Sequence, residues 1–343
     1  MKRIQVQEAV GHVLGHDITK IIPGTFKGVA FKKGHVIREE DIEELLNIGK
    51  YTVFALELGH DEVHENEAGA RLAQAFAGQN IRLSEPKEGK VTLYATVDGL
   101  LKIEVETLFG VNSIDNITMS TLHTNSPVKQ DQVVAATRII PLTIPAQTVE
   151  QVERLCSQLP EGLIRVRPFG HKRIGALVTG TEIFEGRTRD GFDETVGRKV
   201  ESYGQSVFKK INAPDDTDKI SLAISRLKAL GADVIVVTGG MSVDPDDKTR
   251  RGLMEAGVKV LFYGTPILPG AMFLLGQLGR TTVMGLPACV FYHPNTIFDI
   301  FFPRVLADDR ITKEDMIRLG HGGLCRNCSV CVFPVCAFGK GSA

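Results

Sequence analysis

The sequence lacks any apolar run long enough to span a bilayer, which requires about 18 to 20 residues. Its first twenty residues, MKRIQVQEAVGHVLGHDITK, also lack the apolar core of a secretory signal peptide. An excess of one charge is lacking as well: 40 Lys and Arg face 41 Asp and Glu, for a net charge of −1. That balance gives no electrostatic reason to expect nucleic acid or a membrane as a partner. We therefore expect a cytoplasmic protein that binds neither.

Familiar catalytic motifs are absent too. No Walker loop and no Ser-His-Asp arrangement can be picked out. His60 and His64 stand four residues apart, but Asp61 follows His60 where a zinc protease motif has Glu. No internal repeat or low-complexity segment is present. With 343 residues, the chain is long enough for two globular domains and a tail.

Residues 1–145 mix strand-like and helix-like patterns in an order typical of an α+β domain. Two alternating apolar runs flank Asp98 and Gly99, which predicts a hairpin with a type I′ turn. Helices are expected over residues 38–49 and 65–78, from their apolar stripes and acidic first turns.

After residue 165 the pattern changes to short, continuously apolar runs that alternate with helical segments of about 10 to 15 residues. Two such runs end at Gly180 and at Gly240. This alternation indicates a mainly parallel sheet covered by helices on both faces. We assign residues 166–310 to this α/β domain and residues 146–165 before it to a linker that contains one helix.

The two apolar runs end alike, with Thr179-Gly180 in one and Thr238-Gly239-Gly240 in the other. Ligands of open α/β sheets bind beyond the carboxyl ends of the strands. Glycine lets the backbone come close to a ligand there and present N–H groups to a phosphate. The alternative interpretation of each glycine-containing strand end is a turn that binds no ligand.

Three carboxylates follow the second run: Asp244, Asp246 and Asp247. A cap for the helix that comes next needs one carboxylate, supplied by Asp246 or Asp247. Glu182, after the neighbouring strand, would bring a fourth to the same edge. Four carboxylates around a phosphate would repel it, and a bridging Mg²⁺ removes that conflict.

These residues resemble the molybdopterin-binding domain shared by MogA-type adenylyltransferases, MoeA-type molybdotransferases and CinA-like proteins. The resemblance covers roughly residues 170–310 and rests on four stretches in the order and spacing of that domain: LVTGTEIF, TGGMSVDPDDKT, ILPGAMF and TVMGLPACV. More loosely, AVGHVLGHDIT near the N-terminus resembles the opening of MoeA-type proteins.

The resemblance implies a three-layer α/β domain, a pterin ligand (molybdopterin or the molybdenum cofactor) and Mg²⁺. It implies that the terminal phosphate is held by Thr238, Gly239, Gly240 and Ser242. The other implied cofactor-binding residues are Thr179, Gly180, Pro269, Gly270, Gly285 and Pro287. The implied catalytic residues are Asp246, Asp247 and Glu182, and the implied magnesium ligands are Asp244 and Asp247.

The chain also departs from the family pattern. Asp244-Pro245 stands where MoeA-type members have Gly-Asp, and Pro287-Ala288-Cys289-Val290 replaces an expected Pro-Gly-Asn-Pro segment. Three functions therefore stay open: a molybdotransferase, a non-catalytic cofactor carrier or chaperone, and a CinA-like nucleotide pyrophosphatase. The partner of a carrier would be a molybdoenzyme or another protein of the cofactor pathway, and a homo-oligomeric state stays open.

Four of the six cysteines lie in the tail, residues 311–343, with the spacing C-x2-C-x2-C-x4-C: Cys325, Cys328, Cys331 and Cys336. This run resembles the ligand run of bacterial ferredoxins, and a four-thiolate zinc site stays open as the alternative. We expect the tail to hold a metal centre of its own, separate from the pterin domain. Cys289, near the pocket, is expected to be a small buried residue.

Overall fold

The computed structural model describes residues 2–55, 61–242 and 248–341. The chain divides into two compact units. Most of residues 1–166 form the first unit, and residues 167–343 with the short pieces 98–100 and 124–127 form the second. Within the described residues, no helix combines the length and the apolar character needed to cross a membrane.

The first unit begins with a small antiparallel pair and a hairpin. Strand β1 (Lys2–Gln5) pairs with β4 (Thr52–Ala55), and β2 (Ile18–Ile22) pairs with β3 (Phe26–Phe31). Helix α1 (Asp41–Asn47) buries Leu45 against Ile4 and Leu14, and the chain leaves it through Gly49 at φ +75°. This helix and its glycine end are confirmed. A single 3-10 turn, η1 (Val6–Glu8), completes this part.

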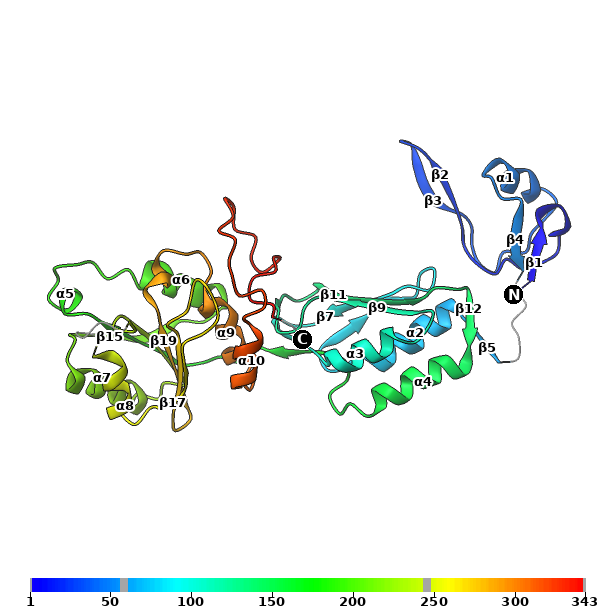
Figure 1. Cartoon of the computed structure of the whole chain (residues 1–343). Helices are drawn as coiled ribbons and strands as arrows, with labels where there is room; N and C mark the ends of the chain where they lie inside the picture. Colours follow the sequence, from blue (N-terminus) through cyan, green and yellow to red (C-terminus); the bar gives the residue numbers. More distant parts are fainter. Residues whose placement is uncertain (1, 56–60, 243–247, 342–343) are drawn as a thin grey trace. The chain divides into compact units, whose positions relative to one another are not determined.

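The rest of the first unit packs helices against an antiparallel sheet of order β6-β7-β11-β9 (Figure 1). The predicted second helix is confirmed as α2 (Glu65–Phe76), whose Leu72 and Phe76 are buried in the core. The remaining elements are β5 (Glu62–His64), β6 (Ile81–Leu83), β7 (Val91–Ala95), β8 (Gly99–Ile103), α3 (Val105–Asn112), β9 (Ile117–Thr121), β10 (Pro127–Val128), β11 (Val133–Ile139), β12 (Thr143–Pro145), α4 (Ala146–Ser157) and β13 (Ile164–Pro168).

Residues 146–165, expected to form a linker with one helix, contain that helix as α4 and the start of β13. Val149 and Val152 on α4 are buried in the same core as Leu72. Arg71 on α2 donates two hydrogen bonds, at 2.9 and 2.8 Å, to the Glu153 carboxylate on α4. This segment is therefore part of the first unit's packing.

The hairpin expected around Asp98 and Gly99 is wrong. β7 lies between β6 and β11, while β8 lies in another sheet, of order β10-β8-β13. Both sides of β7 already have partners, so no edge is left for β8. Leu100 and Leu101, which are adjacent in β8, are both buried, whereas a hairpin with one solvent face would expose one of them.

The second unit is built on a six-stranded sheet of order β15-β14-β16-β19-β18-β17. The strands β15, β14, β16 and β19 run parallel, and the β19–β18 and β18–β17 pairs are antiparallel. The expected mainly parallel sheet is confirmed. The strands are β14 (Ile174–Thr179), β15 (Val207–Ala213), β16 (Val234–Thr238), β17 (Lys259–Tyr263), β18 (Leu274–Leu278) and β19 (Thr281–Leu286).

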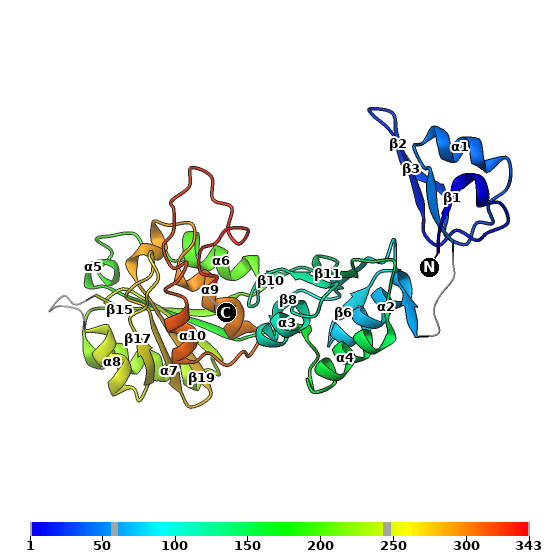
Figure 2. The ribbon, with the colours of Figure 1, turned by 45° about the vertical axis from the view of Figure 1, so that its right-hand side comes forward.

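Helices cover both faces of this sheet, which makes three layers (Figures 1 and 2). On β16, Val234 and Val236 join one core, and Ile235 and Val237 join the other, as strand alternation requires. Helices α7 (Thr217–Ala229) and α8 (Thr249–Glu255) pack on the second core. The first core lies under η2 (Asp193–Gly197), α6 (Arg198–Ser202), α9 (Ile297–Leu306) and α10 (Lys313–Arg318).

Helices α7 and α8 begin differently. Asp216 caps α7, since its carboxylate accepts a hydrogen bond from Lys219 N at 2.9 Å. The residue before α8 is Lys248, which makes no side-chain cap, and the predicted caps Asp246 and Asp247 lie outside the described residues. The short elements α5 (Thr181–Phe184) and η3 (Ala288–Phe291) follow β14 and β19.

Candidate functional site

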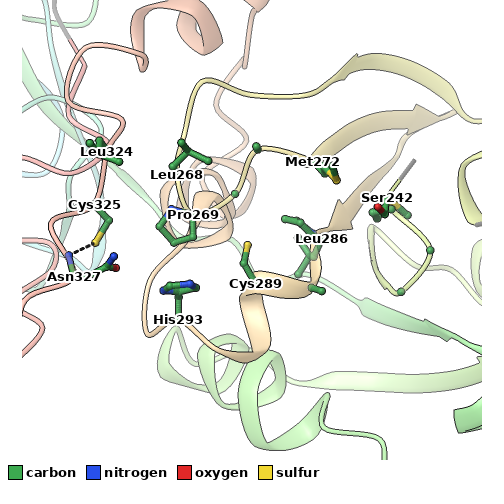
Figure 3. A pocket seen from close by; sticks show the side chains of 17 residues that line it. Ser242, Leu268, Pro269, Met272, Leu286, Cys289, His293, Leu324, Cys325 and Asn327 are labelled. Atoms are coloured by element: carbon green, nitrogen blue, oxygen red, sulfur yellow. Dashed lines mark hydrogen bonds between the residues drawn. The ribbon is translucent and has the colours of Figure 1, made fainter. Parts of the chain in front are cut away.

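A cavity of about 690 Å³ lies at the carboxyl ends of β16 and β19. The register pairs Val237 with Gly285 and Thr238 with Leu286, so both strands end at the same level. Four segments line the cavity. Residues 239–242 follow β16, residues 268–272 precede β18, and residues 286–289 and 293 lie at and after the end of β19. The fourth segment is residues 324, 325 and 327 of the tail. Figure 3 shows Cys289 and His293 across from Leu268 and Pro269, with Cys325 and Asn327 beyond them.

Gly239 and Gly240 form the turn that brings backbone to the cavity. Their φ angles are +90° and +56°, in the left-handed region that favours glycine. A Cβ on Gly239 would lie 2.1 Å from the carbonyl oxygen of Thr179, and one on Gly240 would lie 2.2 Å from Oγ1 of Thr249. Neither position has room for a side chain, so this wall of the cavity is bare backbone.

A buried group of threonines lies behind that turn. The hydroxyl of Thr179 is 2.8 Å from that of Thr249 and 3.2 Å from the carbonyl oxygen of Thr238. Thr238 Oγ1 is buried and makes no hydrogen bond to another residue in the described part of the chain. Thr179 and Thr238, predicted to touch the ligand, therefore lie beneath the turn, and Thr249 is a supporting residue that sequence reasoning missed.

Gly270 and Gly285 serve the cavity in different ways. Gly270 lines it at φ +139°, and a Cβ there would lie 2.8 Å from Cβ of Ile297 at the start of α9. Gly285 lies inside β19, where its missing side chain makes room for Met241, whose sulfur would be 2.6 Å from a Cβ. Met241 lines the cavity, and its carbonyl oxygen accepts a 2.8 Å hydrogen bond from the hydroxyl of Tyr263.

The walls carry little charge. Among the described lining residues, the ionisable side chains are His293 and the thiols of Cys289 and Cys325. Burial raises the pKa of the Cys289 thiol, so this group stays protonated near neutral pH. Cys289, expected to be buried, is half-exposed and lines the cavity. An anion in this cavity would be held by backbone N–H groups and the hydroxyl of Ser242.

Gly180 and Glu182 lie outside the cavity lining, at the start of the short helix α5. The Glu182 carboxylate folds back to within 2.9 Å of the position a Cβ on Gly180 would take. Nearby, Asp215 accepts hydrogen bonds from the backbone N–H of Thr181 at 2.9 Å and from its hydroxyl at 3.2 Å. Asp215 was missed, although Pro214-Asp215-Asp216 follows a strand just as the other acidic residues do.

The acidic residues Asp244, Asp246 and Asp247 lie outside the described residues. Over the described ranges 2–55, 61–242 and 248–341, no group of three or more His, Cys, Asp or Glu side chains is arranged to hold a metal ion. That search includes Glu182 and all four tail cysteines. The predicted magnesium and tail metal sites therefore stay predictions.

The tail packs against the second unit. Leu319 and Phe338 are buried in the same core as α9. Leu324 forms a parallel bridge with Leu268: Leu268 N donates to Gly323 O, and Cys325 N donates to Leu268 O, both at 2.8 Å. The tail is thus attached to the loop that carries Pro269 and Gly270.

Residues 175–307 match the family model described as a probable molybdopterin binding domain. The chain therefore contains such a domain, as its sequence predicted, and the three-layer fold agrees with that assignment. Residues 3–57 match a second model, a domain of unknown function designated DUF8806.

Several curated relatives are CinA-like proteins, and two of them illustrate the similarity. One, from Syntrophus aciditrophicus, is 33% identical over 89 residues, which is 26% of this chain and 21% of that protein. The other, from Frankia casuarinae, is 34% identical over 84 residues, which is 24% of this chain and 19% of that protein. The matches span about a fifth of the length of these relatives.

Among solved structures, the molybdopterin biosynthesis protein MoeA from Pyrococcus horikosii is similar over 90% of this chain and 74% of that chain. Its sequence identity is 13% and its TM-score 0.34. The molybdopterin biosynthesis enzyme MoaB from Thermus thermophilus is similar over 39% of this chain and 89% of that chain, with 21% identity and a TM-score of 0.31.

Proposed function

We propose that this protein binds molybdopterin, or its adenylylated form, in the cavity beyond β16 and β19 and acts in molybdenum cofactor biosynthesis. The observation that carries the proposal is the bare-backbone wall made by Gly239 and Gly240 inside the segment that matches the molybdopterin-binding family. Left-handed glycines at a strand end can aim N–H groups at phosphate oxygens without needing a basic side chain.

The two ends of the cavity suit the two ends of such a ligand. The phosphate would lie against Gly239, Gly240 and Ser242, where the donors are. The flat pterin would lie against the apolar lining that includes Pro269, Met272 and Pro287. A volume of about 690 Å³ falls in the usual range for a small-molecule pocket, about 300 to 1,000 Å³.

Magnesium belongs to this proposal through the acidic residues that follow Ser242 in the sequence. Asp244 is two residues beyond Ser242, which lines the cavity, and the lining holds no Lys or Arg among its described residues. Because no basic side chain in the described lining offsets the negative charge of the phosphate, a cation held by carboxylate ligands would balance that charge. We assign Asp244 and Asp247 as its ligands and Asp246 as an acidic residue acting on the phosphate. Glu182, which lies outside the cavity lining, is given no contact with the phosphate. Bound there, Mg²⁺ would polarise the phosphate.

Three activities are compatible with pterin binding, and the sequence of the cavity wall favours one. Pro287-Ala288-Cys289 places an alanine and a thiol where catalytic relatives are expected to have Gly-Asn-Pro, which supports a carrier or chaperone. The molybdotransferase is the second candidate, and the CinA-like relatives support a nucleotide pyrophosphatase as the third. The predicted tail metal centre, an iron–sulfur cluster or zinc, is a separate proposal on which none of the three functions depends.

One experiment separates these activities. The full chain is incubated anaerobically with adenylylated molybdopterin and Mg²⁺, with and without molybdate, and AMP is quantified. Retention of the ligand on the protein without AMP release supports the carrier. AMP release that requires molybdate identifies the transferase, and hydrolysis of unrelated dinucleotides identifies the pyrophosphatase. Failure to retain or turn over the pterin nucleotide would refute pterin binding.

A further inference from the structure

A second cavity, of about 340 Å³, lies beside the first and is lined by all four tail cysteines. Phe333 and Phe338 form its apolar part, with ring centroids 6.2 Å apart. Phe338 is buried in the core of the second unit, and Gly339 N donates to Gly322 O at 3.0 Å, which closes the tail into a loop. The cysteines are therefore carried by an anchored loop that faces a common space.

Two of the four sulfurs already accept N–H hydrogen bonds. Asn327 N donates to Cys325 Sγ at 3.5 Å (Figure 3), and Asn295 Nδ2 donates to Cys331 Sγ at 2.8 Å. Asn327 has φ +49°, which turns the chain between Cys325 and Cys328. Donors directed at sulfur stabilise the thiolate over the thiol and are typical of the surroundings of thiolate-bound metals. They are a second observation, independent of the cysteine spacing, that points to a metal.

The two cavities share a wall. His293, Leu324, Cys325 and Asn327 line both of them. Leu324 and Cys325 are held against Leu268 by two backbone hydrogen bonds, and Leu268 precedes Pro269 in the first cavity. A displacement of Cys325 would therefore change the shape of both cavities.

We propose that the four tail cysteines bind one thiolate-ligated metal centre in the second cavity, and that its occupancy sets the pterin affinity of the first cavity through this shared wall. The thiols are not within metal-binding geometry in the described structure, so loading the metal draws them together. Cys328 and Cys331 are exposed, whereas Cys325 is half-buried in the shared wall. Closure around the metal thus repositions Cys325 and Asn327 at the pterin cavity.

Linkage makes the coupling reciprocal: metal changes pterin affinity by the same factor by which pterin changes metal affinity. We expect a factor of at least about five, the lower end of common coupling strengths. The coupling rests on the proposed function, but the metal site does not, and it can be measured without any pterin.

The first test titrates metal-free, reduced full chain with cobalt(II), a spectroscopic substitute for zinc. One cobalt per chain should bind, with thiolate-to-cobalt charge-transfer absorption. Cys331→Ser should weaken binding by about 100-fold or more, beyond the effect of losing an outer hydrogen-bond partner. Cys156→Ser, which changes a buried cysteine of the first unit, should bind cobalt normally. Metal and sulfide analysis of anaerobically purified protein then distinguishes one zinc from an iron–sulfur cluster.

Absence of thiolate-bound cobalt, together with absence of iron and zinc in anaerobically purified protein, would overturn the metal site. The second test measures molybdopterin affinity of the loaded and the metal-free protein. A change of five-fold or more that Cys331→Ser abolishes supports the coupling. Pterin binding that is unaffected by metal would overturn the coupling while leaving pterin binding itself established.

Discussion

At the scale of single residues, Gly239 and Gly240 shape the cavity because neither has room for a Cβ. The side chain of Met241, the next residue, occupies the space left by the missing side chain of Gly285. The carbonyl oxygen of Met241 accepts a hydrogen bond from the hydroxyl of Tyr263. Thr179 and Thr249 support the turn from below with a hydroxyl pair. A ligand cradle made of backbone is thus positioned by side chains that do not themselves touch the cavity.

Gly240→Ala tests this packing. The new Cβ would require φ +56° for alanine and would contact Thr249 Oγ1 at 2.2 Å. We expect the free energy of unfolding of the second unit to fall by roughly 2 to 4 kcal/mol, from left-handed strain plus overpacking. Urea denaturation measures it. Gly110→Ala is the matched control, because Gly110 lies in helix α3 with nothing within 4 Å of an added Cβ and should be slightly stabilised. Equal stability of the two variants would contradict the proposed packing.

Asp247→Asn tests the magnesium proposal. If the carboxylate ligates a metal on the phosphate, Mg²⁺-dependent pterin binding or turnover should fall by roughly 100-fold or more, the scale for losing one electrostatic stabiliser. The measurement is pterin affinity across a Mg²⁺ titration. Asp218→Asn, at an acidic position in the first turn of α7, is the control. Wild-type magnesium dependence in Asp247→Asn would remove this residue from the ligand set.

At the scale of elements, the pairing of α2 with α4 shows how a segment predicted as a linker joins a core. Arg71 and Glu153 join the two helices by a bidentate ion pair that is about one-third exposed. The hydrogen bond from Arg71 lowers the pKa of the Glu153 carboxyl. A lowered folded pKa adds stability above the unfolded value of about 4.3, and this is lost as the pH falls through the folded pKa.

Glu153→Gln should therefore destabilise the first unit at pH 7 by up to about 1 kcal/mol, a limit set by solvent screening of this partly exposed pair. The difference from wild type should shrink toward zero as the pH falls below about 4. Chemical denaturation across this pH range measures it. Glu150→Gln, one turn earlier on α4 in a looser pair with Arg154 at 3.7 Å, should show a smaller effect. A pH-independent difference for Glu153→Gln would contradict the account.

The elements that could be predicted are those with a local cause. Residues 234–237, just before Thr238, are all apolar because helices cover both faces of the sheet, and that pattern is visible in one sequence. The pairing of β7 and β8 could not be predicted, because their partners β11 and β13 are distant in sequence. Nor could the tail's docking, since Cys325 meets Leu268 across more than fifty residues through backbone hydrogen bonds that no side-chain pattern encodes.

The same reasoning applies to the site. Gly239, Gly240, Ser242, Pro269, Gly270 and Pro287 were predicted from strand ends and family resemblance, and all of them line the cavity. Thr249 and Asp215 were missed because their contacts with Thr179 and Thr181 join segments brought together by the fold.

At the scale of the whole molecule, the two units have separate cores, and every residue that lines the candidate pterin cavity belongs to the second. The tail belongs to that unit as well, and it supplies part of the cavity wall. The second unit thus combines a bare-backbone cradle, an apolar wall and a cysteine-rich border around one cavity. This combination is the physical basis for assigning pterin binding to it.

Pterin binding by wild-type protein and by Ser242→Asp tests that assignment most directly. Ser242 lines the cavity with an exposed side chain, so aspartate there leaves the packing intact and places a negative charge where the phosphate would bind. Each protein is purified anaerobically from cells that make molybdopterin, and the released, oxidised pterin is measured by fluorescence. We predict about one pterin per wild-type chain, at least a tenfold loss in Ser242→Asp from charge repulsion, and no loss in Ser113→Asp, an exposed site in the first unit. Equal pterin content in Ser242→Asp and wild type, or none in wild type, would contradict the account.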